Sequence, residues 1–236
     1  LGWETMRSWN IGFDLGMLNN RLTVSFDWFN RKTINMVGPA PELPVTLGAN
    51  VPKMNNADMQ STGFELDLGW RDRIKDFDYG VHLLLSDDRQ KILKYPNTTG
   101  KINTWYVGKY NGDIWGFGTI GIAKSQEEMD AHLASLPNGG QDALGVKWGA
   151  GDIMYRDLNG DGKISDGATL NDPGDKKVIG NTSPRFRFGL DLNASWKGID
   201  VRLFFQGVAK RDAWLNDNMF WGATGGIWQS ACFTSH

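Results

Sequence analysis

The chain contains very little cysteine and histidine. Among 236 residues there is one cysteine, Cys232, and there are three histidines, His82, His132 and His236. A single cysteine excludes a disulfide within the chain and leaves the redox compartment open. The histidines are scattered, without the spacing of metal ligands or of a nucleophile–base pair. Acidic residues are plentiful, as in a glycosidase, but they alternate along predicted strands or fall in one Asp-rich loop. We therefore expect no enzyme.

Long apolar runs and an excess of positive charge are also missing. No stretch approaches the roughly eighteen apolar residues of a membrane-spanning helix, and Leu1 opens no signal peptide. The net charge is −2 and the pI is about 5.9, which gives no support to a nucleic-acid partner. What the chain has instead is 11 Trp, 12 Phe and 30 Gly, a composition that favours a turn-rich β protein. Any membrane crossing would have to use strands.

Strict alternation of apolar and polar residues marks the strands. Ile11, Phe13 and Leu15, for example, alternate with Gly12 and Asp14. Each alternating run spans roughly nine to twelve residues, which is longer than a typical soluble strand and close to the length that crosses a bilayer at a tilt. Six such strands are predicted, near residues 8–18, 21–32, 62–72, 77–87, 185–197 and 199–209.

Short and long connections alternate between these strands. The short ones are Asn19–Asn20, Arg71–Asp76 and Lys197–Gly198, and the long ones are 33–61 and 88–184. All eight prolines lie in connections, where they cost no ladder hydrogen bond. This asymmetry is typical of outer-membrane barrels. We predict an all-β fold, an antiparallel transmembrane β-barrel fragment with long extracellular loops. The alternative is a soluble carbohydrate-binding β-sandwich with a structural calcium.

The barrel prediction assigns side chains to the two faces of the sheet. The midpoints of the apolar faces should meet membrane lipid, and the charged midpoints should face a wet interior. The first set is Phe13, Val24, Leu66, Leu83, Leu190 and Leu203, and the second is Asp14, Asp27, Glu65, Asp67, Asp191 and Arg202.

An Asp-rich segment in the longer loop, "RDLNGDGKISDG" at residues 156–167, has the spacing of a calcium loop. Oxygen ligands at alternate positions, followed by a glycine turn, can wrap one Ca²⁺ ion. The twelfth position, where a bidentate acid is expected, holds Ala168, so a later acid has to close the site. A solvated acidic turn without a metal is the alternative. The predicted structural Ca²⁺ ligands are Asp157, Asn159, Asp161, the Lys163 carbonyl, Ser165, and Asp166 or Asp175.

The same loop carries a short predicted helix and an aromatic cluster. "SQEEMDAHLASL" begins with a capping box, in which Ser125 precedes Glu128 by three residues. The aromatic residues could stack on sugar rings, although packing within the loop is the more ordinary role. The candidate substrate-binding residues are Trp105, Tyr106, Tyr110 and Trp115.

Residues 151–208, "GDIMYRDLNGDGKISD" through "DKKVIGNTSPRFRFGLDLNASWKGIDVRLFFQGV", resemble the SusC/RagA-like TonB-dependent outer-membrane transporters of Bacteroidetes. "NNADMQSTGFELDLGW" and the N-terminal "WNIGFDLGMLNNRLTVSFDWFNRKT" are similar to preceding barrel strands of that family. The sequence departs from the family pattern at "GATLNDPG", an insertion in the Asp-rich loop, and at the final "WQSACFTSH".

The resemblance implies TonB-dependent nutrient uptake across the Gram-negative outer membrane. The implied cargo is an oligosaccharide or a peptide, and the implied partners are a SusD-like lipoprotein, outer-membrane lipid, and TonB through an N-terminal part. Such receptors have a plug domain and a barrel of about 22 strands. Six strands are therefore one piece of a barrel, with the plug domain and C-terminal strands absent from this chain.

Overall fold

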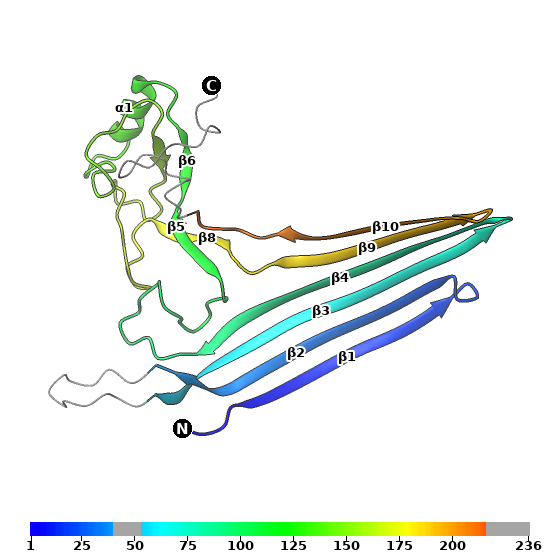
Figure 1. The fold of residues 1–236 in the computed structure, drawn as a ribbon. Helices are drawn as coiled ribbons and strands as arrows, with labels where there is room; N and C mark the ends of the chain where they lie inside the picture. The colour runs from blue at the N-terminus through cyan, green and yellow to red at the C-terminus, as the bar shows by residue number, and fades with distance from the viewer. Residues whose placement is uncertain (40–52, 216–236) are drawn as a thin grey trace, which may run out of the picture.

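The computed structural model describes residues 1–39 and 53–215. Six long strands form one antiparallel sheet in the order β1-β2-β3-β4-β9-β10, open at both edges (Figure 1). The strands are β1 (Thr5–Met17), β2 (Leu22–Gly38), β3 (Met54–Ile74), β4 (Phe77–Lys94), β9 (Arg185–Trp196) and β10 (Ile199–Lys210). They correspond in order to the six alternating segments of the sequence.

Two of the strands extend well into the predicted loop 33–61. β2 and β3 stay paired as far as Gly38 and Met54, with bulges near Thr33 and Met36. β4 likewise continues seven residues past the predicted end at 87, to Lys94. The alternation signal fades in these extensions because polar and apolar residues are mixed on both faces, as expected where neither face has to meet hydrocarbon. Residues 40–52 of the predicted loop lie outside the described part of the chain.

Tight turns join the strands at the opposite end of the sheet. Asn19 and Asn20 have φ of 57° and 61°, and Lys197 and Gly198 have φ of 46° and 84°. Left-handed backbone at the centre of a short turn matches the twist of a two-stranded hairpin, and Asn and Gly tolerate it best. The turn between β3 and β4 is shorter than the predicted Arg71–Asp76, because the strands continue to Ile74 and from Phe77.

The strand register separates the two predicted sets of side chains. Residues directly opposite each other share a face, so Phe13, Phe26, Leu66 and Leu85 form one apolar row across four strands. Applied to all six strands, the register puts every residue of the predicted lipid-facing set on one face. Every residue of the predicted interior set lies on the other face.

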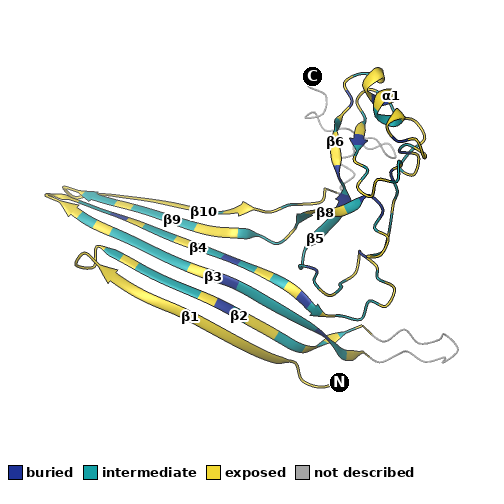
Figure 2. Cartoon of the chain, turned by 180° about the vertical axis from the view of Figure 1, so that it is seen from behind, coloured by how far each residue is buried: buried dark blue, intermediate teal, exposed yellow. Residues whose placement is uncertain are grey.

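In the described part of the chain, most of the apolar face is exposed. Phe13 is 56% exposed, Leu203 is 51% exposed and Phe205 is 52% exposed. Figure 2 shows the edge strands β1 and β10 exposed along almost their whole length. Among the described residues, no second large sheet packs on this face, so the arrangement is that of an unclosed barrel segment and not that of the alternative sandwich. The described residues also contain no helix that is long and apolar enough to span a membrane.

The segment between β4 and β9, residues 95–184, stands at the end of the sheet opposite the short turns (Figure 1) and is called the excursion below. It contains β5 (Asp113–Phe117), β6 (Thr119–Ile122), α1 (Gln126–Ala134), β7 (Ile153–Tyr155) and β8 (Lys176–Asn181). β5 pairs with β8 and β6 pairs with β7. These two small sheets were not predicted from the sequence.

The predicted capping box begins α1. The Ser125 hydroxyl accepts a hydrogen bond from the Glu128 backbone N–H at 3.3 Å, and the Glu128 carboxylate accepts one from the Lys124 N–H at 2.7 Å. Met129 on this helix packs with Ala123 and Met154 in a small core of the excursion. The helix is therefore part of a folded loop and not of a separate domain.

Candidate functional site

The Asp-rich loop folds as a compact acidic turn. Gly160 and Gly162 have φ of 76° and 78°, and both donate their N–H groups to the Asp157 carboxylate, at 2.6 and 2.9 Å. The Asn159 side-chain oxygen accepts a hydrogen bond from the Asp161 N–H at 2.9 Å. The two glycines supply the left-handed backbone that wraps the chain around these side chains.

Asp175 closes the loop from the far side of the insertion. It is completely buried, and its carboxylate accepts hydrogen bonds from the backbone N–H groups of Leu158 and Ser165, each at 2.7 Å. Carboxylate oxygens of Asp157, Asp161 and Asp175 lie within 4.8 Å of one another. Of the two candidates for the closing acid, the structure places Asp175 in the cluster.

The other predicted ligands have other surroundings. Asp166 forms an ion pair with Lys176 and lies outside the cluster. The Ser165 hydroxyl donates to Asp175 at 3.2 Å, and the backbone of Lys163 forms a parallel bridge with Gly140. The cluster therefore consists of three acids from two segments.

The electrostatics of this cluster suit a cation. Burial opposes ionisation of Asp157, but hydrogen bonds from the Gly162 and Gly160 N–H groups outweigh it and hold the pKa of that carboxyl below its usual range. Within the described residues, no basic side chain forms an ion pair with Asp157, Asp161 or Asp175. Oxygens bound to one Ca²⁺ at about 2.3–2.6 Å lie at most roughly 5 Å apart. The three acids therefore fit a hard divalent ion.

The four predicted aromatic residues do not form one platform. The Trp115 indole donates to the Tyr106 hydroxyl at 3.2 Å, and their rings meet edge to face. Tyr110 is not part of this pair and lies beside β4, with the Arg89 guanidinium over its ring. Trp105, packed edge-on against Tyr95, lines a groove with Val37, Gly38, Pro39 and Lys53 at the outer end of the β2–β3 hairpin.

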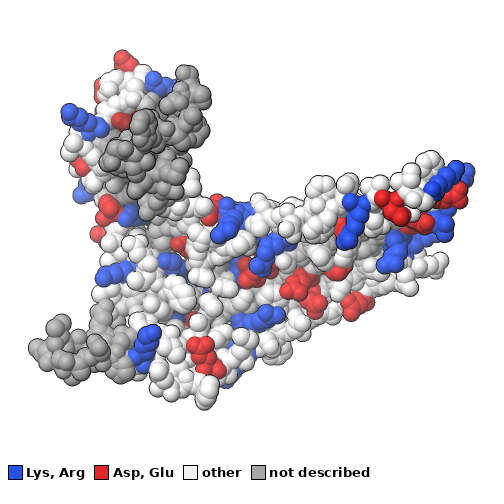
Figure 3. Space-filling view, in the orientation of Figure 1, with Lys and Arg blue, Asp and Glu red and all other residues white. Residues whose placement is uncertain are grey.

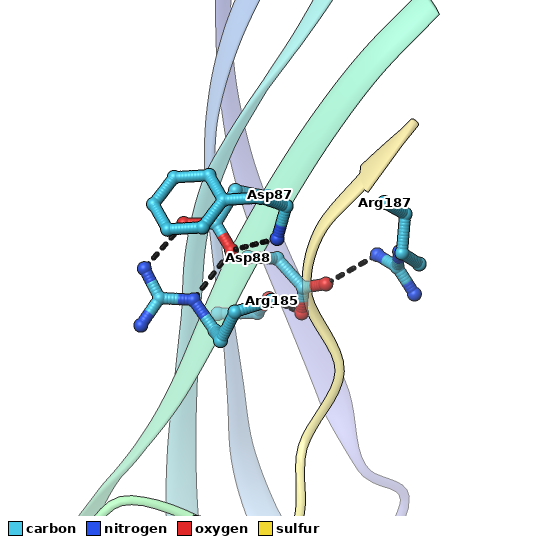
Figure 4. Close-up of polar contacts among 6 residues, drawn as sticks. Asp87, Asp88, Arg185 and Arg187 are labelled. Atoms are coloured by element: carbon cyan, nitrogen blue, oxygen red, sulfur yellow. Dashed lines mark hydrogen bonds and ion pairs between the residues drawn. The ribbon is translucent and has the colours of Figure 1, made fainter. Parts of the chain in front are cut away.

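Two ion pairs join β4 to β9 at the root of the excursion (Figure 4). Arg185 makes a two-pronged contact with Asp87, and Arg187 contacts Asp88 at 2.6 Å. Phe186 has a φ of 53°, which interrupts the regular alternation of side chains between the two faces of β9. The Arg185 side chain therefore lies on the face of the sheet that carries Asp87, and the first pair can form. The Phe186 N–H also donates to Asp87, at 3.2 Å. The sequence analysis missed this anchor, although the acidic pair Asp87–Asp88 before the excursion and the two arginines Arg185 and Arg187 after it were a visible signal.

The face of the sheet opposite the apolar one carries charged contacts. Figure 3 shows acidic and basic side chains along the length of the sheet on the face in view. His82 contacts Asp67 at 2.6 Å, and Arg202 pairs with Asp191 on the same face. Leu84 and Phe204 are apolar exceptions on this face, where they flank Gly189. A charged face on one side and an apolar face on the other is the pattern of a barrel wall.

Comparisons with known proteins agree with this architecture. The chain is similar to the TonB-dependent receptor P3 of Formosa agariphila, with 26% identity over 220 residues, covering 87% of this chain and 20% of the relative. It is also similar to the TonB-dependent receptor SusC of Bacteroides thetaiotaomicron, with 25% identity, covering 85% of this chain and 19% of SusC. The chain thus spans about a fifth of the length of these relatives.

The fold is shared with a solved structure, that of the RagAB peptide importer in a closed-closed state. The TM-score is 0.61 at 24% identity, and the match covers 96% of this chain and 23% of the other. The family model described as "TonB dependent receptor-like, beta-barrel" matches residues 1–228. With its open antiparallel sheet, apolar outer face and charged opposite face, the chain belongs to the TonB-dependent receptor-like β-barrel family.

Proposed function

We propose that the protein containing this chain imports a nutrient across the outer membrane of a Gram-negative cell, using energy delivered by TonB. The observation that carries the proposal is the family match over residues 1–228, together with the two-faced sheet. The short turns then lie on the periplasmic side, and the excursion lies outside the cell. In this role the six strands are a section of barrel wall, and the excursion is a surface loop of the receptor.

A surface lipoprotein of the SusD type is the proposed partner. The likeness to SusC and to the RagAB importer supports a two-component receptor. The excursion is the part of this chain that is suited to such a contact. It has its own small core, and two ion pairs join β4 to β9 at the point where the excursion leaves the sheet. A partner would therefore meet a preformed surface.

The proposed cargo is an oligosaccharide, with a peptide as the second candidate. The groove beside Trp105 supports a sugar contact, because an aromatic ring can pack on a sugar face. The peptide candidate is supported by the fold shared with a structure named as a peptide importer. The described residues of the groove are Val37, Gly38, Pro39, Lys53, Tyr95, Thr104 and Trp105.

Uptake by cells tests the proposed function. A strain lacking the complete receptor should lose accumulation of either labelled oligosaccharides or labelled peptides, and a protonophore should abolish the same uptake in the parent strain. Trp105→Ala should lower uptake of that cargo, because it removes the aromatic wall of the groove. Val107→Ala, an exposed change two residues away and outside the groove lining, is the control. Unchanged uptake of both cargo classes in the deletion strain would contradict the proposal.

We also propose that Asp157, Asp161 and Asp175 hold a structural Ca²⁺ ion, with Asn159, Ser165 and the Lys163 carbonyl as further oxygen donors. The ion would offset the repulsion of three carboxylates within 4.8 Å and join the Asp-rich loop to the strand that follows the insertion. The fully buried Asp175 would be its innermost ligand. Because the closing acid is displaced from the usual twelfth position, the expected Kd is modest, about 10⁻⁴–10⁻³ M.

Limited proteolysis of the complete receptor tests the calcium proposal. Added Ca²⁺ should protect the segment 156–175 from cleavage, and a chelator should remove that protection. Asp161→Asn should abolish the calcium-dependent part of the protection, since it removes one of the three clustered charges. Asp166→Asn, which neutralises an acid paired with Lys176, should keep it. Equal cleavage of the unmodified receptor with and without Ca²⁺ would show that the segment is an acidic turn only.

A further inference from the structure

On the apolar face of the sheet, successive rows of side chains become more polar toward the excursion. The strand register aligns Ile11, Trp28, Phe64 and Asp87 in one row, and Trp9, Asn30, Thr62 and Arg89 in the next row toward the excursion. The row after that consists of Arg7, Lys32, Gln60 and Lys91. Three of these four residues are cations, so this is called the basic row. It lies on the same face as the predicted lipid-facing side chains, because alternate residues of a strand share a face.

Neighbouring acids do not neutralise the basic row. Asp87 lies two rows below and is held by Arg185 and the Phe186 N–H. Asp58, toward the outer end of β3, accepts a hydrogen bond from the Asn35 N–H at 2.9 Å. No ion pair involves Arg7, Lys32 or Lys91 within residues 1–39 and 53–215. The row and Arg89 just below it therefore present a net positive strip.

A groove connects this strip to the apolar band. Its lining includes Trp28, Phe64, Arg89, Lys91 and Tyr110. The Tyr110 ring lies close to both cations, with its centroid 4.8 Å from the Arg89 guanidinium carbon and 5.9 Å from the Lys91 ammonium. The excursion thus forms one wall, with cations at the outer end of the groove and aromatic rings at its inner end.

The height of the strip fits the boundary of a membrane. Ten residues separate Phe77, near the short turns, from Asp87 on β4. They span roughly 33 Å of strand, or about 25 Å of height at a tilt of about 40°, which is the height of the apolar band of an outer-membrane barrel. Arg89 and Lys91 then lie just above the outer edge of the hydrocarbon, at the level of lipid headgroups.

We propose that the basic row and Arg89 bind the phosphate groups of a phosphorylated glycolipid in the outer leaflet, with the acyl chains lying on the apolar rows below. The inference rests on the proposed outer-membrane location. Arg7 and Lys32 are opposite each other on neighbouring strands and lie about 5 Å apart, and Lys91 is two strands from Lys32, about 10 Å away, so these cations can contact one phosphate or a pair of phosphates. A lipid is the occupant favoured by the arrangement, because the same groove offers cations above and aromatic and aliphatic side chains directly beneath. Free phosphate would use only the upper half of the groove.

Lipid binding to the complete receptor in detergent tests the proposal. The probes are diphosphorylated lipid A, its dephosphorylated counterpart and inorganic phosphate, and bound molecules are counted by native mass spectrometry. The test variant is Lys32→Gln with Lys91→Gln. The matched control is Arg31→Gln with Lys101→Gln, which removes the same charge from the opposite face of β2, where Arg31 lies over Phe29, and from the excursion.

The unmodified receptor and the control should bind diphosphorylated lipid A equally and prefer it to both other probes. The test variant should bind it roughly tenfold to thirtyfold more weakly, because each cation near an anionic lipid surface contributes about a factor of five. Equal binding by the test and control variants, or binding of inorganic phosphate as tight as that of the lipid, would overturn the inference. Cell fractionation tests the proposed outer-membrane location separately. If that location is wrong, the receptor will be missing from the outer-membrane fraction.

Discussion

Phe26→Arg is expected to destabilise the folded receptor by about 1–3 kcal/mol, because an arginine on the lipid face costs about 2–4 kcal/mol at the bilayer midplane and less toward the bilayer edge, and Phe26 lies one row below Asp87. Phe26 lies between Phe13 and Leu66 in the apolar row, with its ring 5.7 Å from that of Phe13 and 6.2 Å from that of Phe64. An arginine there has no acidic partner in the row and loses the aromatic contacts. The free energy of unfolding of the complete receptor, measured by denaturant titration in lipid vesicles, checks the value.

Ser25→Arg is the matched control for this change. Ser25 is the preceding residue on β2, and the register places it between Asp14 on β1 and Asp67 on β3. An arginine at that position gains two acidic neighbours on the charged face, so its effect on unfolding should be small. A larger loss of stability in Ser25→Arg than in Phe26→Arg would reverse the assignment of the two faces.

Asp87→Asn is expected to cost about 3–5 kcal/mol, because it breaks a buried ion pair and leaves one charge without its partner. The Asp87 and Arg185 side chains are only 9% and 17% exposed. The remaining Arg185 charge would lie against the sheet at the root of the excursion. The change should therefore loosen the excursion as well as lower the free energy of unfolding, which protease cleavage within residues 95–184 would detect.

Asp88→Asn provides the control for Asp87→Asn on the adjacent residue. Its partner Arg187 is 50% exposed, so water and salt screen the pair, and such pairs contribute about 0–1 kcal/mol. Equal losses in the two variants would mean that Asp87–Arg185 is not the anchor of the excursion. Cleavage of the excursion unchanged by Asp87→Asn would have the same meaning.

The sequence predicted the strands best where the two faces of the sheet meet different surroundings. Around Phe13 and Asp14, one face requires apolar side chains and the other polar ones, and that difference is visible as alternation. It disappears beyond Thr33, where β2 and β3 continue with polar and apolar residues mixed on both faces. There the strands are maintained by backbone pairing, which leaves no pattern in the side chains.

The candidate site could be predicted only to the extent that it is local. Asp157, Asn159 and Asp161 are two residues apart, so spacing alone identified them. The choice of Asp175 over Asp166 depends on how the insertion folds back and on the pairing of Asp166 with Lys176. The contact of Arg185 with Asp87 joins residues that are 98 positions apart and depends on one reversed φ angle at Phe186. A prediction based on the alternation of polar and apolar residues cannot locate a residue at which that alternation is interrupted.

Sidedness in living cells tests the central claim, that this sheet is part of an outer-membrane barrel whose excursion lies outside the cell. In a complete receptor whose native cysteines, Cys232 included, are replaced by serine, one cysteine is placed at Val146 or at Asp76. Val146 is 90% exposed in the excursion, and Asp76 lies in the exposed turn between β3 and β4. A membrane-impermeant maleimide should label Val146→Cys on intact cells, and Asp76→Cys only after the outer membrane is permeabilised. Labelling of Asp76→Cys on intact cells, with Val146→Cys protected, would contradict the account.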